Sequence, residues 1–222
     1  LGAQSLWNDE GASVVMAHRA LPEIAVHAAA DIHPPGYYTL LSGWVLLTGD
    51  SELALRMLSA LESVLTVALV YALGRRLFGV GAALIAALLL AGNSFAVYYA
   101  QEARMYAQLA LLSAAGMWAL LLWLAAEGGS PQSAQAQNSR PAAAKSLAAL
   151  ALINAAGLYT QYAYPFSMVA QGAIFLLAWL RRRDGRTLGL YIAANLGTLI
   201  LFAPWAGTAI RQVTAWPNTG AG

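Results

Sequence analysis

Long apolar runs separated by short polar segments dominate the chain from residue 57 onward. A helix needs about 20 mainly apolar residues to cross a bilayer, at a rise of about 1.5 Å per residue. Most of the runs approach this length, although the fifth is short. The pattern predicts an all-α polytopic membrane protein with about six transmembrane helices, near residues 57–74, 80–97, 105–124, 147–164, 166–180 and 188–206.

The first 56 residues are more polar and predict short surface helices. Residues 9–21 favour one such helix. Gly36 to Thr48 forms an apolar run of only 13 residues, which is too short to span. Pro34 and Pro35 suit its start, because proline is tolerated in the first turn. We expect this helix to lie along the membrane surface; if it crossed instead, residues 1–35 would lie on the cytoplasmic side.

The pattern divides the chain into three parts. Residues 1–56 are expected to form a first outer loop with juxtamembrane helices. Residues 57–206 form a transmembrane module, and residues 207–222 begin a further outer loop. Because Leu1 is not an initiator Met and the chain ends in a polar tail, we expect a fragment that lacks at least one upstream span.

Composition agrees with a membrane protein. The 222 residues are 59% hydrophobic and 10% charged, whereas soluble domains carry about 25% charged residues. The absence of cysteine excludes disulfides and thiolate metal sites. Nucleic-acid binding has no support, because the basic residues flank the apolar runs.

The distribution of charge predicts an orientation. The segment 127–146 is rich in Gly, Ser, Gln and Ala and is expected to be a flexible loop. This segment and the turns at 75–76 and 181–186 hold eight of the twelve Lys and Arg residues. The positive-inside rule makes that side cytoplasmic. Asp9, Glu10, Asp31 and Glu102 then face the outside.

Asp9 and Glu10 form the first island of charge. Ionisable groups at the ends of spans are functional-site candidates, because charge beside lipid is costly. A carboxylate here could act as a general base on an acceptor hydroxyl or amine. The structural alternative is helix capping by Asn8 or Asp9, with both acids in a first turn where they suit the helix dipole.

Two further islands could bind an anion. His33 precedes a helix N-terminus, where free N–H groups favour phosphate; the alternative is a proline-stiffened turn. Arg104 suits bidentate phosphate binding, or else pairs with Glu102 or extends to the interface. For Arg56 and Glu62, mutual structural pairing is favoured.

The remaining polar and aromatic residues are less informative. Tyr159–Tyr162 and Pro204-Trp205 suit an aromatic belt, with a lipid groove as the alternative. The histidines have no metal-ligand spacing, so no metal site is predicted. The sequence requires no cofactor, and it leaves a divalent metal requirement unknown.

Taken in order, the islands resemble a known group, the C-type (GT-C) membrane glycosyltransferases that use dolichyl- or undecaprenyl-phosphate sugars. This group includes protein O-mannosyltransferases and aminoarabinose transferases. The segments that carry the resemblance are Trp7-x-Asp9-Glu10, Asp31-x-His33-Pro34-Pro35-x-Tyr37-Tyr38, Ser51-Glu52-x-x-x-Arg56, Gly74-Arg75-x-Leu77-Phe78-Gly79, Gln101-Glu102-Ala103-Arg104-x-Tyr106, Tyr159-Thr160-x-Tyr162 and Pro204-Trp205 followed by Arg211-Gln212.

The resemblance implies a fragment of a larger GT-C fold and assigns roles. Asp9 is the leading catalytic base, with Glu10 and Glu102 as further acidic candidates. His33, Arg56 and Arg104 are the candidates for binding the donor phosphate. Tyr37, Tyr106 and Tyr162 are candidates for a substrate groove. Gln161 stands where relatives often carry His, which leaves the role of that position in doubt.

The implied function is inverting transfer of a sugar from a polyprenyl-phosphate donor. The protein is expected in a bacterial inner membrane, with its active site facing away from the cytoplasm. The acceptor, whether lipid, glycan or protein, is not identified. Two alternatives stay open. A secondary transporter or lipid carrier would keep polar groups near the bilayer midplane. A non-catalytic assembly subunit would leave Asp9 far from Arg104.

Overall fold

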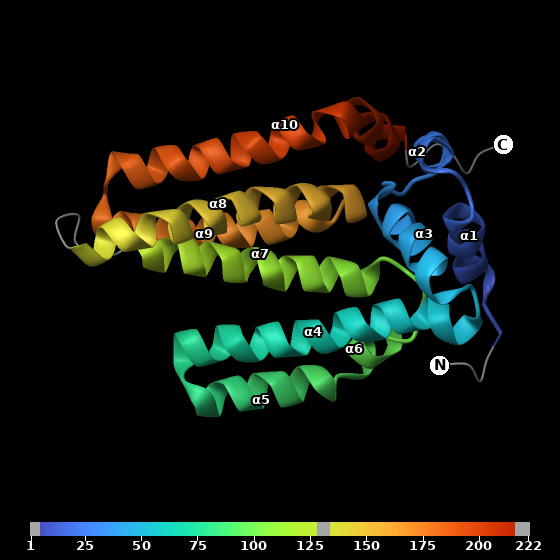
Figure 1. Cartoon of the computed structure of the whole chain (residues 1–222), viewed down its shortest axis with the longest axis horizontal. Coiled ribbons are helices and arrows are strands. Elements are labelled where there is room, and N and C mark those ends of the chain that lie inside the picture. Colours follow the sequence, from blue (N-terminus) through green and yellow to red (C-terminus); the bar gives the residue numbers. More distant parts are fainter. Residues whose placement is uncertain (1–4, 128–133, 216–222) are drawn as a thin grey trace.

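The computed structural model describes residues 5–127 and 134–215, and all regular elements in these residues are helices. Figure 1 shows an elongated bundle of long helices with three short helices gathered at one end. The short helices are α1 (Asn8–Ala17), α2 (Leu21–Ala30) and α3 (Gly36–Thr48). The bundle contains α4 (Glu52–Phe78), α5 (Val80–Ala91), α6 (Ser94–Tyr99), α7 (Tyr106–Glu127), α8 (Ala134–Thr160), α9 (Tyr164–Arg182) and α10 (Gly185–Ala215).

Four described helices are long and apolar enough to cross a membrane: α4, α7, the Pro141–Thr160 part of α8, and α10. The 19-residue α9 lies beside them. The predicted run 80–97 is not one helix, because α5 ends at Ala91 and α6 starts at Ser94. Asn93 causes the break, since its side chain accepts the Ala96 N–H at 3.0 Å and caps α6.

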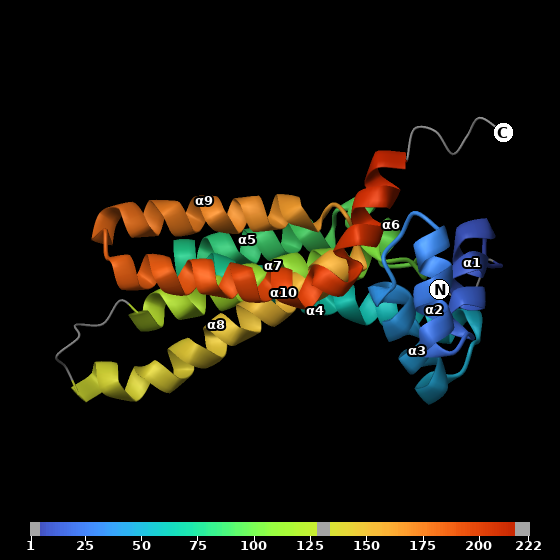
Figure 2. The ribbon, with the colours of Figure 1, turned by 90° about the horizontal axis from the view of Figure 1, so that it is seen from above.

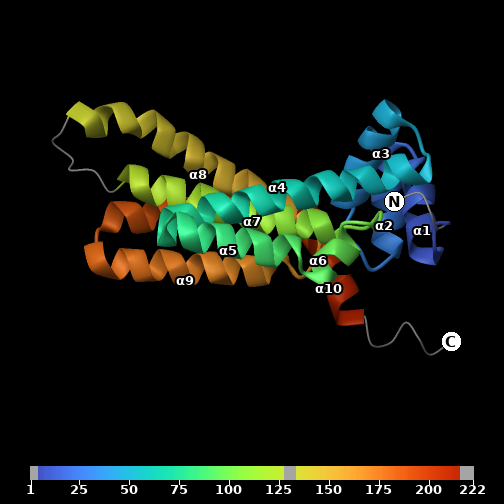
Figure 3. The same cartoon turned by 90° about the horizontal axis from the view of Figure 1, so that it is seen from below.

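The predicted flexible loop at 127–146 is wrong for residues 134–146, which extend α8. Alanine is abundant there and has the highest helix propensity. Residues 128–133 lie outside the described part. Figure 3 shows the N-terminal half of α8 diverging from α7.

Two other boundaries differ from the sequence expectation. The helix predicted at 9–21 is divided, because α1 ends at Ala17 and α2 begins at Leu21. Pro22 lies in the first turn of α2, where its missing N–H needs no partner. At the other end of the chain, α10 continues to Ala215 with Pro204 inside it, and Figure 2 shows the helix bending towards its C-terminus.

An apolar core fixes α1–α3 against the end of the bundle. Ile24, Tyr37, Leu41, Leu55 and Met105 are fully buried in it and come from α2, α3, α4 and the segment before α7. α3 has the predicted bounds. It also abuts the end of α8, because a Cβ at Gly36 would lie 2.5 Å from the Tyr159 carbonyl oxygen. The short helices are therefore a packed part of the fold.

The basic connections lie at the opposite end from α1–α3. The turns between α4 and α5 and between α9 and α10 carry the arginines at 75–76 and 181–186. Figure 1 places both turns, the C-terminus of α7 and the N-terminus of α8 at that end. The predicted grouping of these segments on one side is confirmed, whereas the cytoplasmic assignment stays a prediction.

Candidate active site

The acid pair lies in the first turn of α1, as predicted. The helix begins at Asn8 with Trp7 in the cap position, so the predicted cap at Asn8 or Asp9 is wrong. Glu10 reaches back instead, and its Oε2 accepts the Trp7 N–H at 3.4 Å. Adjacent helical residues point about 100° apart at 3.6 residues per turn. The two carboxylates therefore meet different surroundings.

Glu10 is buried in an ion pair with Arg56. Its Oε2 lies 2.7 Å from Arg56 Nη2, and its Oε1 lies 2.9 Å from Arg56 Nε. Oε1 also accepts the Ala103 N–H at 2.9 Å. The pairing of Arg56 is thus with Glu10 rather than with Glu62, whose Oε2 is buried without a hydrogen-bond partner. Glu10 joins α1, α4 and the segment that leads into α7.

The environment keeps Glu10 ionised. Burial by itself raises the pKa of a carboxyl group. Here the hydrogen bond from Arg56, the Ala103 N–H and the charge of Arg56 outweigh burial and hold the pKa of Glu10 below its ordinary value. Both carboxylate oxygens of Glu10 already accept hydrogen bonds from the protein. Glu10 therefore holds Arg56 and the Ala103 backbone in position.

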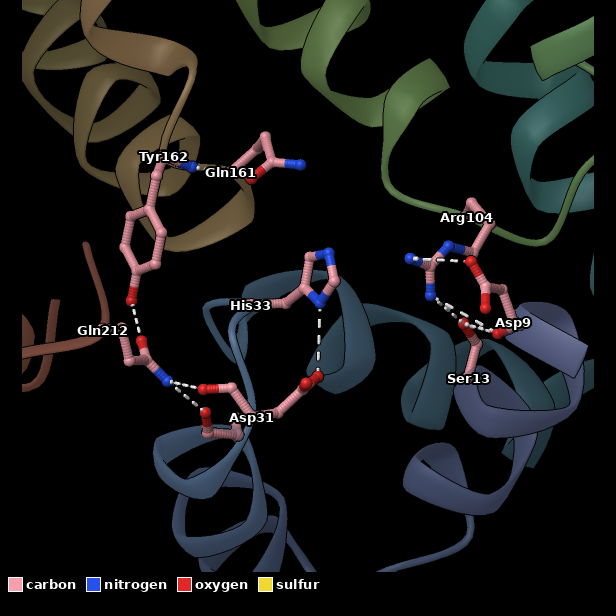
Figure 4. Close-up of polar contacts among 9 residues, drawn as sticks. Asp9, Ser13, Asp31, His33, Arg104, Gln161, Tyr162 and Gln212 are labelled. Carbon is pink, nitrogen blue, oxygen red and sulfur yellow. Dashed lines mark hydrogen bonds and ion pairs between the residues drawn. The ribbon is translucent and has the colours of Figure 1, made fainter. Parts of the chain in front are cut away.

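Asp9 points away from Glu10 and meets Arg104. The Asp9 side chain is 49% exposed, and its Oδ2 lies 3.7 Å from Arg104 Nη2. Arg104 Nη1 donates to the Asp9 carbonyl and to Ser13 Oγ, each at 3.4 Å. Figure 4 shows these contacts. The pairing of Arg104 is therefore with Asp9, not with Glu102 as one sequence alternative had it.

His33 lies in the turn between α2 and α3. Its Nδ1 lies 3.2 Å from Asp31 Oδ2, which leaves Nε2 on the far edge of the ring, as Figure 4 shows. The hydrogen bond with His33 holds the pKa of Asp31 below its ordinary value despite burial, and the charge of Arg104 acts in the same direction. The turn thus presents a histidine backed by a carboxylate.

Two cavities are lined by residues of this part of the chain. An apolar cavity of about 890 Å³ lies between α4, α5, α6, α7 and the start of α9. A smaller pocket of about 340 Å³, called the polar pocket below, is lined by Ile32, His33, Tyr106, Gln161, Tyr162 and Val213. Tyr106 lines both. A molecule with an apolar tail and a polar head would fit across this junction.

The other predicted residues fall in several places. Tyr106 and Tyr162 line the polar pocket, whereas Tyr37 is fully buried in the core between α3 and α4. Glu102 is buried, and its carboxylate lies beside the Tyr98 hydroxyl. Asp9, His33 and Arg104 are thus brought to one end of the bundle, with Glu10 and Arg56 behind them.

Sequence reasoning gave no role to three residues that hold this region. Ser13 contacts Arg104, and Gln212 contacts the loop that carries His33. Gln161 turns its Oε1 to the Tyr162 N–H, 2.9 Å away, which leaves its NH₂ group for the pocket. Gln212 belongs to the Arg211-Gln212 motif, but nothing in the local sequence indicates its partners Ala28, Asp31 and Tyr162, which are far away along the chain.

The model of the dolichyl-phosphate-mannose-protein mannosyltransferase family matches residues 32–207. The chain belongs to this family. The predicted GT-C membership is therefore confirmed. A search of curated proteins found no match.

The fold of this mannosyltransferase-family chain is also known from a solved structure. It resembles the crystal structure of ArnT from Cupriavidus metallidurans in the apo state, with a TM-score of 0.62 and 17% sequence identity. The similarity covers 96% of this chain and 39% of ArnT. The chain thus forms part of a larger GT-C fold, as expected.

The mannosyltransferase family match includes some of the candidate site residues and leaves out others. His33, Arg56, Arg104, Tyr106 and Tyr162 lie within it, whereas the acids of α1 precede it. The described residues contain no group of three or more His, Asp or Glu side chains placed to hold a metal ion. Because Asp9 lies outside the matched range, its candidate role as catalytic base is supported in the structure by its contact with Arg104.

Proposed function

We propose that this chain carries the donor site of a membrane glycosyltransferase, which transfers a sugar from a polyprenyl phosphate to an acceptor outside the cytoplasm. The observation that carries the proposal is Tyr106, which lines both the apolar cavity and the polar pocket and lies two residues after Arg104 in the chain. A polyprenyl-phosphate sugar has the matching division into lipid, phosphate and sugar. Family membership supports this class of donor.

The apolar cavity suits the lipid part of the donor. Its walls combine side chains such as Val64, Leu90, Phe95 and Leu109 from four helices. Its volume of about 890 Å³ falls in the range of small-molecule sites. Because two of its walls, α4 and α7, are helices able to span the membrane, a lipid tail can enter it without exposing apolar surface to water.

Arg104 and His33 are suited to hold the phosphate. The guanidinium group of Arg104 has spare donor capacity, because its contact with Asp9 is 3.7 Å and its Nε is buried without a hydrogen-bond partner. Charge-assisted hydrogen bonds are normally about 2.7–2.9 Å long. Arg56 is already committed to Glu10, so we assign it a supporting place behind the site.

Asp9 is suited to act as general base. Its half-exposed carboxylate can accept a proton from the hydroxyl or amine of the acceptor. The acceptor then bonds to the anomeric carbon while the bond from that carbon to the phosphate oxygen breaks, and in-line attack inverts the configuration. The polyprenyl phosphate leaves with its electron pair, and Arg104 and His33 stabilise the charge that develops on it. The donor carries its own leaving group, so the step consumes no second reactant.

The alternatives have less support. A non-catalytic subunit was expected to leave Asp9 far from Arg104, whereas the two side chains lie 3.7 Å apart. A transporter is favoured only by Glu62, a buried acid inside α4 with one unpartnered oxygen. The site residues otherwise gather at the α1–α3 end of the bundle, not at its middle.

The test is substitution of Asp9 in the complete membrane protein, assayed with labelled polyprenyl-phosphate mannose and membrane acceptors. We expect Asp9→Asn to lower transfer by about 100-fold or more, the usual loss for a general base. Asp50→Asn is the matched control, because Asp50 is an exposed acid 3.4 Å from His18 in the same region. Near-normal turnover by Asp9→Asn would overturn the assignment of Asp9 as general base. If the wild-type protein transferred sugar from neither a mannosyl nor an aminoarabinosyl donor, the proposed function would be overturned.

A further inference from the structure

The C-terminal end of α10 packs on α2 through Ala28, Trp205 and Ala209, and the buried polar side chain of Gln212 adds hydrogen bonds to this contact. Its Nε2 donates to the Ala28 carbonyl at 2.6 Å and to the Asp31 carbonyl. Its Oε1 accepts a hydrogen bond from the Tyr162 hydroxyl. Gln212 is 9% exposed, and it joins segments that are more than 180 positions apart.

The network continues behind the polar pocket. Trp205 Nε1 donates to the Tyr162 hydroxyl at 2.9 Å, so both groups from α10 converge on the same tyrosine. Figure 4 shows Gln212 between Tyr162 and the backbone of Asp31, with His33 next to that backbone. A single amide thus bridges α2, α10 and the turn between α8 and α9.

Gln212 does not line the polar pocket but contacts or adjoins most of its wall. Ile32 and His33 follow the Asp31 carbonyl that it binds, Tyr162 binds its Oε1, and Val213 is its chain neighbour. Four of the six lining residues are thereby fixed relative to one another, although they come from three separate segments. Movement of Gln212 would move His33 and Tyr162 apart.

We propose that Gln212 is a positioning residue, which acts through Asp31 and Tyr162 to hold the wall of the polar pocket in the geometry that binds the donor head group. This inference rests on the proposed function and adds a residue to it. Buried hydrogen-bond networks hold neighbouring side chains in one arrangement. Binding sites need this support, because small displacements of their groups are costly.

The chemistry of the amide explains why glutamine suits this position. It donates two hydrogen bonds through its NH₂ group and accepts through its carbonyl oxygen. An ionised glutamate has no donor and would set a negative charge against two carbonyl oxygens. Leucine has a similar size and lacks both functions. The two substitutions therefore break the bridge without removing any residue of the pocket.

The test compares Gln212→Leu with Gln171→Leu in the complete membrane protein. Gln171 is a matched control, because it is 1% exposed and forms a reciprocal amide pair with Asn154 at 3.0 and 3.1 Å, away from both cavities. Both variants are expected to lose thermal stability. Only Gln212→Leu should raise the KM for polyprenyl-phosphate mannose, by about tenfold, the equivalent of one net hydrogen bond, with kcat little changed.

Backbone hydrogen exchange gives a second readout that does not depend on activity. Exchange at the amides of residues 31–33 and 36 should be faster in Gln212→Leu and Gln212→Glu than in the wild type or Gln171→Leu. Unchanged exchange there, or an equal rise in KM for Gln171→Leu, would overturn the positioning role. If the wild type transfers no sugar, the proposed function fails, and the exchange comparison alone still decides whether Gln212 holds the turn.

Discussion

At the scale of single residues, Asp9 and Glu10 show how a helix separates two identical functional groups. Glu10 is 1% exposed and is held by Arg56 and Ala103, whereas the Asp9 side chain is 49% exposed beside Arg104. The residue pattern alone does not distinguish these neighbouring acids, and only the family resemblance made Asp9 the leading candidate. Burial makes Glu10 structural and leaves Asp9 able to meet an acceptor.

We predict that Glu10→Gln destabilises the protein and removes part of its acid sensitivity. Loss of one partner of a buried ion pair costs about 3–5 kcal/mol. This corresponds to a fall in Tm of roughly 6–20 °C for a chain of this size. Because the pKa of Glu10 is lowered on folding, its stabilisation is complete above its ordinary pKa of 4.5 and is lost as the pH falls below it.

Thermal unfolding in detergent across the acidic range would check this. Wild-type Tm should fall more steeply below pH 4.5 than Tm of Glu10→Gln, while Asp50→Asn should follow the wild type, because Asp50 is exposed. Parallel Tm profiles for Glu10→Gln and the wild type would show that the ion pair contributes nothing to acid stability.

At the scale of elements, a polar lock joins α7, α8 and α9 next to the turn that carries Gln161 and Tyr162. The Tyr164 hydroxyl donates to Asn154 at 2.9 Å, and Asn154 pairs with Gln171. The lock needs small residues beside it, because a Cβ at Gly157 would lie 2.3 Å from the Tyr164 ring. Close packing here fixes the start of α9 against α8.

We predict that Gly157→Ala lowers stability, because the added methyl group overlaps the ring of Tyr164, which is fully buried. Overpacking of this kind costs about 1–3 kcal/mol, or roughly 2–12 °C in Tm. Gly197→Ala in α10 is the matched control, since open space surrounds that position. Its Tm should stay equal or rise, and an equal loss in both variants would contradict the steric explanation.

At the scale of the whole molecule, the helices separate two chemically different ends. The connections rich in arginine lie at one end and α1–α3 at the other (Figure 1). The polar pocket belongs to the α1–α3 end, because Ile32 and His33 in the turn between α2 and α3 line it. A positive cytoplasmic side would therefore place the proposed site outside the cytoplasm. Donor head group and acceptor would then meet on that face.

Single cysteines would test this orientation, since this chain has none of its own. In an otherwise cysteine-free complete protein, a membrane-impermeant maleimide should label Asp50→Cys in intact cells. Gly185→Cys, in the α9–α10 connection with open space around it, should react only after permeabilisation. The reverse pattern would place the site on the cytoplasmic face.

Much of the element plan was accessible from the sequence, because apolar runs near the thickness of a bilayer have few alternatives to helix. The bounds of α3 were predicted correctly, since Pro35 and Gly49 flank an apolar run of fixed length. The exceptions were local. Asn93 broke one run by capping α6, and alanine-rich sequence made 134–146 helical where a loop was expected.

The sequence by itself determined the helical membrane architecture, the grouping of the basic connections and the polar islands that carry the chemistry, because these depend on composition and order along the chain. Only the tertiary structure decided which residues of those islands meet. It paired Glu10 with Arg56, set Asp9 beside Arg104, and brought Gln212 to the turn of His33. Those contacts depend on how helices far apart in the chain pack, which no local pattern encodes.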